Sequence, residues 1–142
     1  MKVIHILTHP IFVLALFSLV LISGDNFGGF YLLYVLLALP HGGIHAILAV
    51  AGATILLFSF LKFKGRSVYF IDPLLNILGV FCLYLSLWLF FVHSWDFNSG
   101  TFRAAVPVGS LILFGVVSLG FLVRSIIQFA KMRPSGPSRI YT

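Results

Sequence analysis

Residues 40–61 read PHGGIHAILAVAGATILLFSFL and contain no charged side chain. A helix needs roughly 20 apolar residues to cross a hydrocarbon core of about 30 Å. This stretch therefore predicts a transmembrane helix, and Pro40 marks its start because proline suits the first turn of a helix. The whole chain has the same character: 61% of its 142 residues are hydrophobic, 8% are charged, and the mean hydropathy is +1.14. Soluble domains carry about a quarter charged residues, so the composition indicates an integral membrane protein.

Three other apolar stretches are long enough to cross a membrane, at residues 3–23, 74–92 and 106–129. We therefore predict an all-α integral membrane protein with four transmembrane helices in a bundle. The bundle forms one domain over residues 1–130. The segment 131–142 is predicted to be a disordered cytoplasmic tail, because it combines prolines, serines and glycine.

The second span is preceded by an unusually long uncharged segment, since no charged residue lies between Asp25 and Lys62. One helix over residues 30–61 would be about 48 Å long at 1.5 Å per residue, which exceeds the thickness of the membrane. Residues 29–39 are therefore predicted to form an interfacial or re-entrant helix before the second span. A single tilted and kinked helix is the alternative.

The basic residues are distributed unevenly between the two predicted sides of the membrane. If the amino terminus is cytoplasmic, every lysine and arginine except Arg103 falls on the cytoplasmic side. This bias predicts a multi-pass protein of the cell membrane with both termini in the cytoplasm. The net charge of +6 then reflects topology and attraction to the lipid bilayer. No nucleic-acid partner is expected, because that would need a basic face on a soluble module.

Histidines gather at the predicted outer surface. His41 and His45 lie four residues apart, and His93 ends the third span with Asp96 close behind. Three imidazoles with a carboxylate suit a transition metal such as zinc, copper or iron. We therefore take His41, His45, His93 and Asp96 as candidate metal ligands. His45 and His93 also form a candidate axial pair for haem b. The alternative is that these histidines only face a wet interface.

Small residues indicate where the helices approach one another, because helices in lipid associate closely at small side chains. In the second span, Gly42, Ala46, Ala49 and Ala53 fall on one face. The fourth span carries a less regular set, which comprises Gly109, Gly115, Ser118 and Gly120. Such a face serves either packing within the bundle or self-association.

The sequence favours a non-catalytic function. It has no Ser–His–acid set, phosphate-binding loop or Cys-x-x-Cys motif. We therefore expect an assembly unit, which is either an accessory subunit of a larger membrane complex or a homo-oligomeric pore. Two alternatives stay open. One is a histidine-ligated metal or haem protein with redox or oxygen chemistry, and the other is an ion or small-solute transporter whose second helix is broken at residues 40–43.

Overall fold

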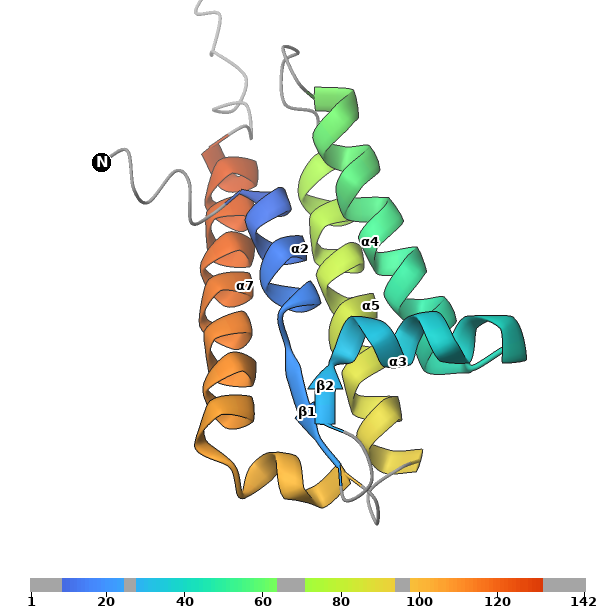
Figure 1. Cartoon of the computed structure of the whole chain (residues 1–142). Helices are drawn as coiled ribbons and strands as arrows, with labels where there is room; N and C mark the ends of the chain where they lie inside the picture. Colours follow the sequence, from blue (N-terminus) through green and yellow to red (C-terminus); the bar gives the residue numbers. More distant parts are fainter. Residues whose placement is uncertain (1–8, 25–27, 64–70, 94–97, 132–142) are drawn as a thin grey trace, which may run out of the picture.

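The computed structural model describes residues 9–24, 28–63, 71–93 and 98–131. The elements, in chain order, are α2 (Pro10–Ser18), β1 (Leu21–Ser23), β2 (Gly28–Phe30), α3 (Tyr31–Ala38), the 3-10 turn η1 (Leu39–His41), α4 (Ile44–Phe63), α5 (Ile71–His93), the 3-10 turn η2 (Ser99–Phe102) and α7 (Ala105–Lys131). The three long helices α4, α5 and α7 run roughly along one direction, and α3 runs across that direction beside the lower end of α4 (Figure 1). We call the end of the molecule with β1, β2, α3 and η2 the hairpin end, and the opposite end the upper end.

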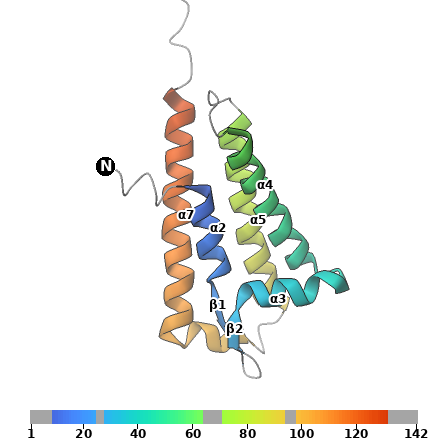
Figure 2. The ribbon, with the colours of Figure 1, turned by 45° about the horizontal axis from the view of Figure 1, so that its top comes forward.

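Three of the described helices are long and apolar enough to cross a membrane, at Ile44–Leu61, Pro73–His93 and Ala105–Gln128. They coincide with the predicted second, third and fourth spans. The shorter apolar stretch Tyr31–His41 precedes them and runs beside the end of α4 near the hairpin end (Figure 2). The prediction of a largely helical membrane protein is therefore confirmed at this level.

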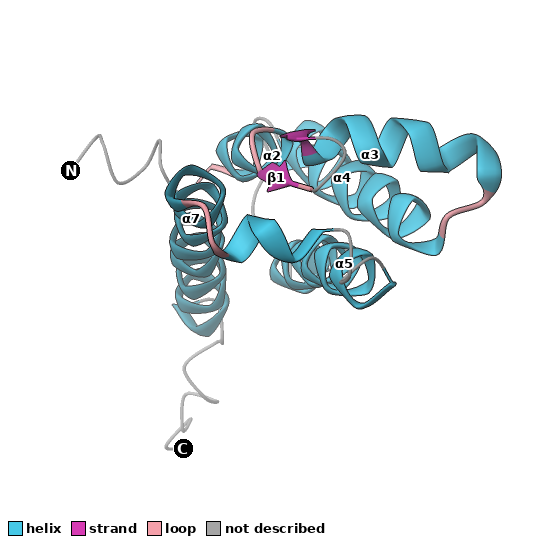
Figure 3. Ribbon diagram, turned by 60° about the horizontal axis from the view of Figure 1, so that its bottom comes forward, coloured by secondary structure: helices cyan, strands magenta, loops and turns pink. Residues whose placement is uncertain are grey.

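The short helix α2 completes the arrangement. It packs against α7 and α4, and α5 packs against the same two helices. Seen from the hairpin end, the four helices surround a common interior (Figure 3). Phe17 of α2 reaches this interior and contacts Phe114 and Tyr31, with both pairs of ring centroids 5.5 Å apart.

The predicted first span differs from the structure in its second half. The helix ends at Ser18 instead of continuing to Ser23, and the chain continues as strand β1. This strand pairs antiparallel with β2, which places Leu21 opposite Phe30 and Ser23 opposite Gly28. The β-branched Val20 and Ile22 favour the change, because such residues suit a strand. The predicted residues 3–8 lie outside the described part.

The extended backbone of β1 is satisfied by hydroxyl groups from distant segments. The N–H of Leu21 donates to Ser110 Oγ of α7, and the N–H of Ser23 donates to Thr101 Oγ1 of η2, each at 2.9 Å. In apolar surroundings an unpaired backbone N–H is expensive, so non-helical backbone at membrane depth must find partners within the protein. These two bonds explain how a strand stands next to α7.

The PHGG sequence forms a corner instead of the start of the second span. Pro40 belongs to η1, and α4 begins at Ile44, so the predicted helix start at Pro40 is wrong by four residues. Gly42 has φ of +70°, a left-handed conformation that glycine adopts without steric penalty. The N–H of Gly43 donates to the carbonyl of Ala38 at 3.1 Å and closes the corner. The uncharged segment before α4 is therefore a separate helix, as predicted, and not one long kinked helix.

Helices α4 and α5 pack more closely than any other pair. A Cβ atom placed on Gly52 would lie 2.7 Å from the carbonyl oxygen of Gly79, so only glycine fits at this crossing. The predicted seam is correct in part. Ala46 and Ala49 are buried, whereas Ala53 is only half-buried and Gly42 is exposed. The buried face of α4 instead continues through Gly52, Leu56 and Ser59.

Hydroxyl and amide groups connect the long helices. Ser59 of α4 donates to Oδ1 of Asn76 on α5 at 2.9 Å, and Nδ2 of Asn76 donates to Ser125 Oγ of α7 at 3.2 Å. Closer to the hairpin end, Tyr84 of α5 contacts Ser118 of α7 at 2.6 Å between hydroxyl oxygens. Such bonds hold helices together where the hydrophobic effect does not act between them.

Candidate histidine site at the hairpin end

His45 is the most enclosed of the described histidines at the hairpin end. It lies in the first turn of α4, and its ring stands edge-to-face on Phe90 with centroids 5.4 Å apart. Its Nε2 atom is buried and has no hydrogen-bond partner among the described residues. A buried nitrogen without a partner is uncommon, and a ligand or ion is one way to satisfy it.

A chain of hydrogen bonds fixes the backbone at His45. The hydroxyl of Ser86 donates to the carbonyl oxygen of His45 at 2.6 Å. Because the single hydroxyl proton of Ser86 is used there, the phenol of Tyr31 donates to Ser86 Oγ at 2.7 Å. Burial raises the pKa of Tyr31 to about 12, against the opposing effect of its bond to Ser86. The phenol therefore stays protonated and keeps its role as donor.

His41 and His93 are both exposed and have the same local geometry. In each, Nδ1 contacts the carbonyl oxygen four residues earlier, at 3.0 Å to Leu37 and 2.9 Å to Leu89. A carbonyl only accepts, so Nδ1 carries a proton, and in the neutral imidazole Nε2 is then the nitrogen with the lone pair. This arrangement satisfies the last carbonyls of a helix, and it is also the tautomer that metal-bound histidines commonly adopt.

The structure brings together only part of the predicted ligand set. His45, in the first turn of α4, contacts Phe90 of α5, three residues before His93, whereas His41 sits on η1, outside α4. Asp96 lies outside the described residues. Within the described ranges, no three His, Cys, Asp or Glu side chains form a group that could hold a metal. The four-residue site therefore stays a prediction that depends on Asp96.

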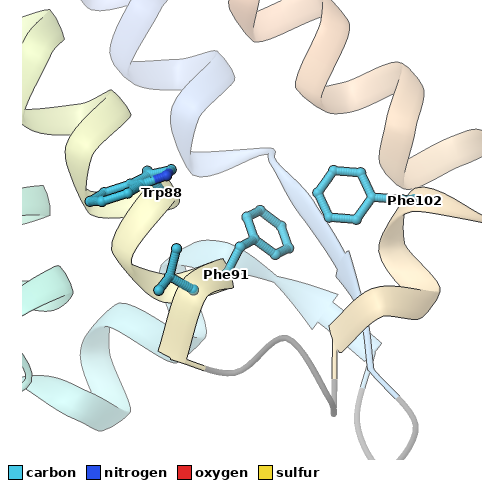
Figure 4. Close-up of a pocket in the computed structure, with 4 residues that line it drawn as sticks. Trp88, Phe91 and Phe102 are labelled. Atoms are coloured by element: carbon cyan, nitrogen blue, oxygen red, sulfur yellow. The ribbon is translucent and has the colours of Figure 1, made fainter.

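An apolar pocket near this end was not predicted from the sequence. It is lined by Trp88, Phe91 and Val92 of α5 and by Phe102 of η2, and it has a volume of about 420 Å³. Phe91 and Phe102 face each other from different elements (Figure 4), with ring centroids 4.9 Å apart. The spacing of Trp88, Phe91 and Val92 is a helical signal, but its partner Phe102 is not predictable from that pattern.

The fold and this site define the class of the molecule: a helical integral membrane protein with three candidate spans and a histidine-bearing hairpin end. Comparison of the chain with protein-family models, with curated proteins and with solved structures found no match.

Proposed function

We propose that the chain is a non-catalytic membrane subunit that assembles with a second copy of itself through α7. The observation that supports this proposal is the face of α7 directed away from the bundle. It consists of six exposed residues at alternating spacings of four and three: Gly109, Leu113, Val116, Gly120, Val123 and Ile127. A mean spacing of 3.5 residues is the repeat by which two helices interlock in a left-handed coiled coil.

The two glycines on this face distinguish it from an ordinary lipid-facing surface. A Cβ atom at Gly109 or Gly120 would meet no heavy atom within 4 Å. Packing within the described chain therefore does not require glycine at either position. Small residues let helices approach closely in lipid, and two copies with the same orientation in the membrane would bring their α7 helices together around a twofold axis.

The opposite face of α7 packs against the rest of the chain, which leaves this face for a partner. Phe114, Ser118, Phe121 and Ser125 are buried against the rest of the chain. At 100° per residue these positions lie on the far side of the helix from Val116 and Gly120. The α7 helix thus has one face for its own fold and one for association.

The proposed topology retains four crossings with both ends in the cytoplasm of a cell, although the first crossing is not a continuous helix. The nine residues of α2 account for about 14 Å. The extended residues 20–23 add roughly 13 Å at about 3.3 Å each. Together they approach the thickness of the hydrocarbon core. The hairpin end is then the outer end, where α3 lies in the interface.

Disulfide cross-linking in lipid bilayers tests the assembly. The native Cys82 is replaced by alanine, and Val116→Cys places one thiol on the proposed face. Phe81→Cys is the matched control, because Phe81 is exposed midway along α5. We expect oxidation to produce dimers of Val116→Cys and not of Phe81→Cys.

A second variant tests the contact directly. We expect Gly120→Leu to weaken dimerisation at least about tenfold, equivalent to 1.4 kcal/mol, because the larger side chain separates the two helices. Far-UV circular dichroism should remain unchanged, since Gly120 faces open space in the monomer. Efficient cross-linking at Phe81, or a monomer at all protein-to-lipid ratios, would show that the proposal is wrong.

A histidine-ligated metal or haem protein is the second candidate, and the unpartnered Nε2 of His45 favours it. His93, at the end of α5, is the candidate partner; its Nδ1 contacts a carbonyl, which leaves Nε2 available to bind a metal. His41 and Asp96 complete the proposed ligand set. Zinc, copper or iron would be held at the outer end, whereas haem would need only the pair His45 and His93.

Elemental analysis and an absorption spectrum of the purified protein test this candidate. We expect close to one metal ion per chain in the wild type and a large loss in His45→Ala. His9→Ala is the control, because His9 caps the start of α2 and contacts Phe60 edge-to-face with ring centroids 4.8 Å apart, away from the hairpin end. Colourless and metal-free protein with an intact fold would remove the candidate.

A further inference from the structure

The apolar pocket between α5 and η2 suggests a binding site that is separate from the α7 face and from the histidines. We infer that it holds an acyl chain of an anionic phospholipid, with the phosphate of that lipid at Arg103. The inference rests on the composition of the pocket, on its position along α5, and on the charge beside it.

The pocket has a surface made almost entirely of carbon. Three of its four lining side chains are large and exposed, with 60% of Trp88, 56% of Val92 and 48% of Phe102 accessible. Its volume of about 420 Å³ is within the range of sites for small ligands, roughly 300–1,000 Å³. A hollow of this kind suits a flexible hydrocarbon chain better than a helix, which would need a longer groove.

The position of the pocket explains why lipid would reach it. Trp88 and Val92 belong to the last two turns of the candidate span Pro73–His93. The pocket therefore opens toward lipid near the boundary between acyl chains and headgroups, the depth at which tryptophan is enriched. A water-soluble partner would not meet this surface.

At the hairpin end, β1 and η2 lie between α5 and α7 (Figure 1). The two helices are joined by Asn76 and Tyr84 farther up, where these side chains bond to α7. Near the hairpin end, β1 is bonded to Ser110 and to Thr101. The strand thus occupies one side of the space between α5 and α7, and the rings of Phe91 and Phe102 partly fill the other side (Figure 4).

Charge selects the headgroup. Arg103 directly follows Phe102, is exposed, and is the arginine that the described residues place at the hairpin end. Guanidinium binds phosphate oxygens with two parallel hydrogen bonds. One basic residue near an anionic surface contributes about 1 kcal/mol to lipid attraction, which corresponds to roughly fivefold in affinity.

Quenching of Trp88 fluorescence by brominated lipids tests the site. The chain has two tryptophans, so Trp95→Phe leaves Trp88 as the sole reporter. This protein is placed in phosphatidylcholine vesicles with a small, equal fraction of brominated phosphatidylglycerol or brominated phosphatidylcholine. We expect about fivefold stronger apparent binding of the brominated phosphatidylglycerol, as one basic residue provides.

Two variants separate the charge from the cavity. Arg103→Gln should reduce the preference for phosphatidylglycerol to the level expected from composition, whereas Arg124→Gln, near the upper end of α7, should not. Val92→Phe should fill the pocket and lower quenching by both lipids. Val50→Phe, at an exposed position of α4, should leave quenching unchanged.

Several results would overturn the inference. Equal quenching by the two brominated lipids in the starting protein would show no headgroup selection. Equal effects of Arg103→Gln and Arg124→Gln would indicate diffuse attraction without a site. Shielding of Trp88 from both lipids, relieved on dilution of the protein in the bilayer, would show that a second copy of the chain covers the pocket.

Discussion

The contact between α4 and α5 predicts that one added methyl group at Gly52 destabilises the protein. A Cβ atom there would lie 2.7 Å from the carbonyl oxygen of Gly79, 2.9 Å from Cδ2 of Leu83 and 3.0 Å from Cβ of Cys82. The nearest of these atoms belongs to the backbone and cannot rotate away. The substitution Gly52→Ala therefore forces the two helices apart.

The expected magnitude follows from two opposing effects. Overfilling a packed interior costs about 1–3 kcal/mol, while alanine in place of glycine in a helix stabilises by up to about 1 kcal/mol. We expect Gly52→Ala to lower the free energy of unfolding by about 1–2 kcal/mol. Gly115→Ala is the control, because its Cβ would make an ordinary contact of 3.8 Å with the hydroxyl of Tyr84. That variant should be as stable as the wild type or slightly more stable.

Gly79, which faces Gly52 across the α4–α5 contact, allows a test of whether steric clash explains the loss of stability. A Cβ atom on Gly79 would lie 2.7 Å from Cγ and 2.9 Å from Cδ2 of Leu56, which are side-chain atoms. Leu56→Ala removes both atoms. The carbonyl oxygen of Gly52, 3.2 Å from this Cβ, would remain. We therefore expect Gly79→Ala to be harmful in the wild type and clearly less harmful in the Leu56→Ala background, with a coupling free energy of about 1–2 kcal/mol. Gly52→Ala should not be rescued in this way, because its obstacle is a carbonyl oxygen.

Unfolding in mixed micelles, driven by increasing sodium dodecyl sulfate and followed by far-UV circular dichroism, measures these differences. The reasoning is refuted if Gly52→Ala is as stable as Gly115→Ala. It is also refuted if Leu56→Ala changes the effect of both glycine substitutions equally, since the clash at Gly52 would then not be with the backbone.

Two further predictions concern the hairpin end. Ser110→Ala leaves the N–H of Leu21 without its acceptor, so we expect a loss of about 1–3 kcal/mol in the free energy of unfolding and faster hydrogen exchange at Leu21. The control Ser18→Ala removes only a bond to a helical carbonyl and should change both quantities little. Equal effects of the two substitutions would contradict the role assigned to Ser110. The folded-state pKa of Tyr31, about 12 against 10.0, implies a stabilising contribution that is complete below pH 10 and is lost as the pH rises toward 12. Ultraviolet titration of the wild type minus that of Tyr31→Phe should show one tyrosine ionising near pH 12, and ionisation near pH 10 would contradict the burial of this phenol.

Much of the helical framework was predictable because length and hydropathy are local properties. The bounds predicted for the second, third and fourth spans agree with α4, α5 and α7 to within a few residues. The separate helix before α4 was also predictable, since one continuous helix would be too long for the membrane. For the candidate site, the sequence placed His45 and His93 near one end, and in the structure they lie in the first turn of α4 and at the last residue of α5; their role as ligands stays a prediction.

What the amino-acid sequence alone determined, then, is that this is a membrane protein, where its three long helices run, and that His41, His45 and His93 share one end. The tertiary structure decided that the first apolar stretch leaves the helical conformation after Ser18, and that Gly52 and Gly79 form the closest helix contact. The reason is physical. Hydropathy counts apolar residues without regard to backbone conformation, whereas the strand at Leu21 depends on a hydroxyl group 89 residues away. A glycine is also compatible with many conformations, and only the helix that packs against it shows why no larger residue fits.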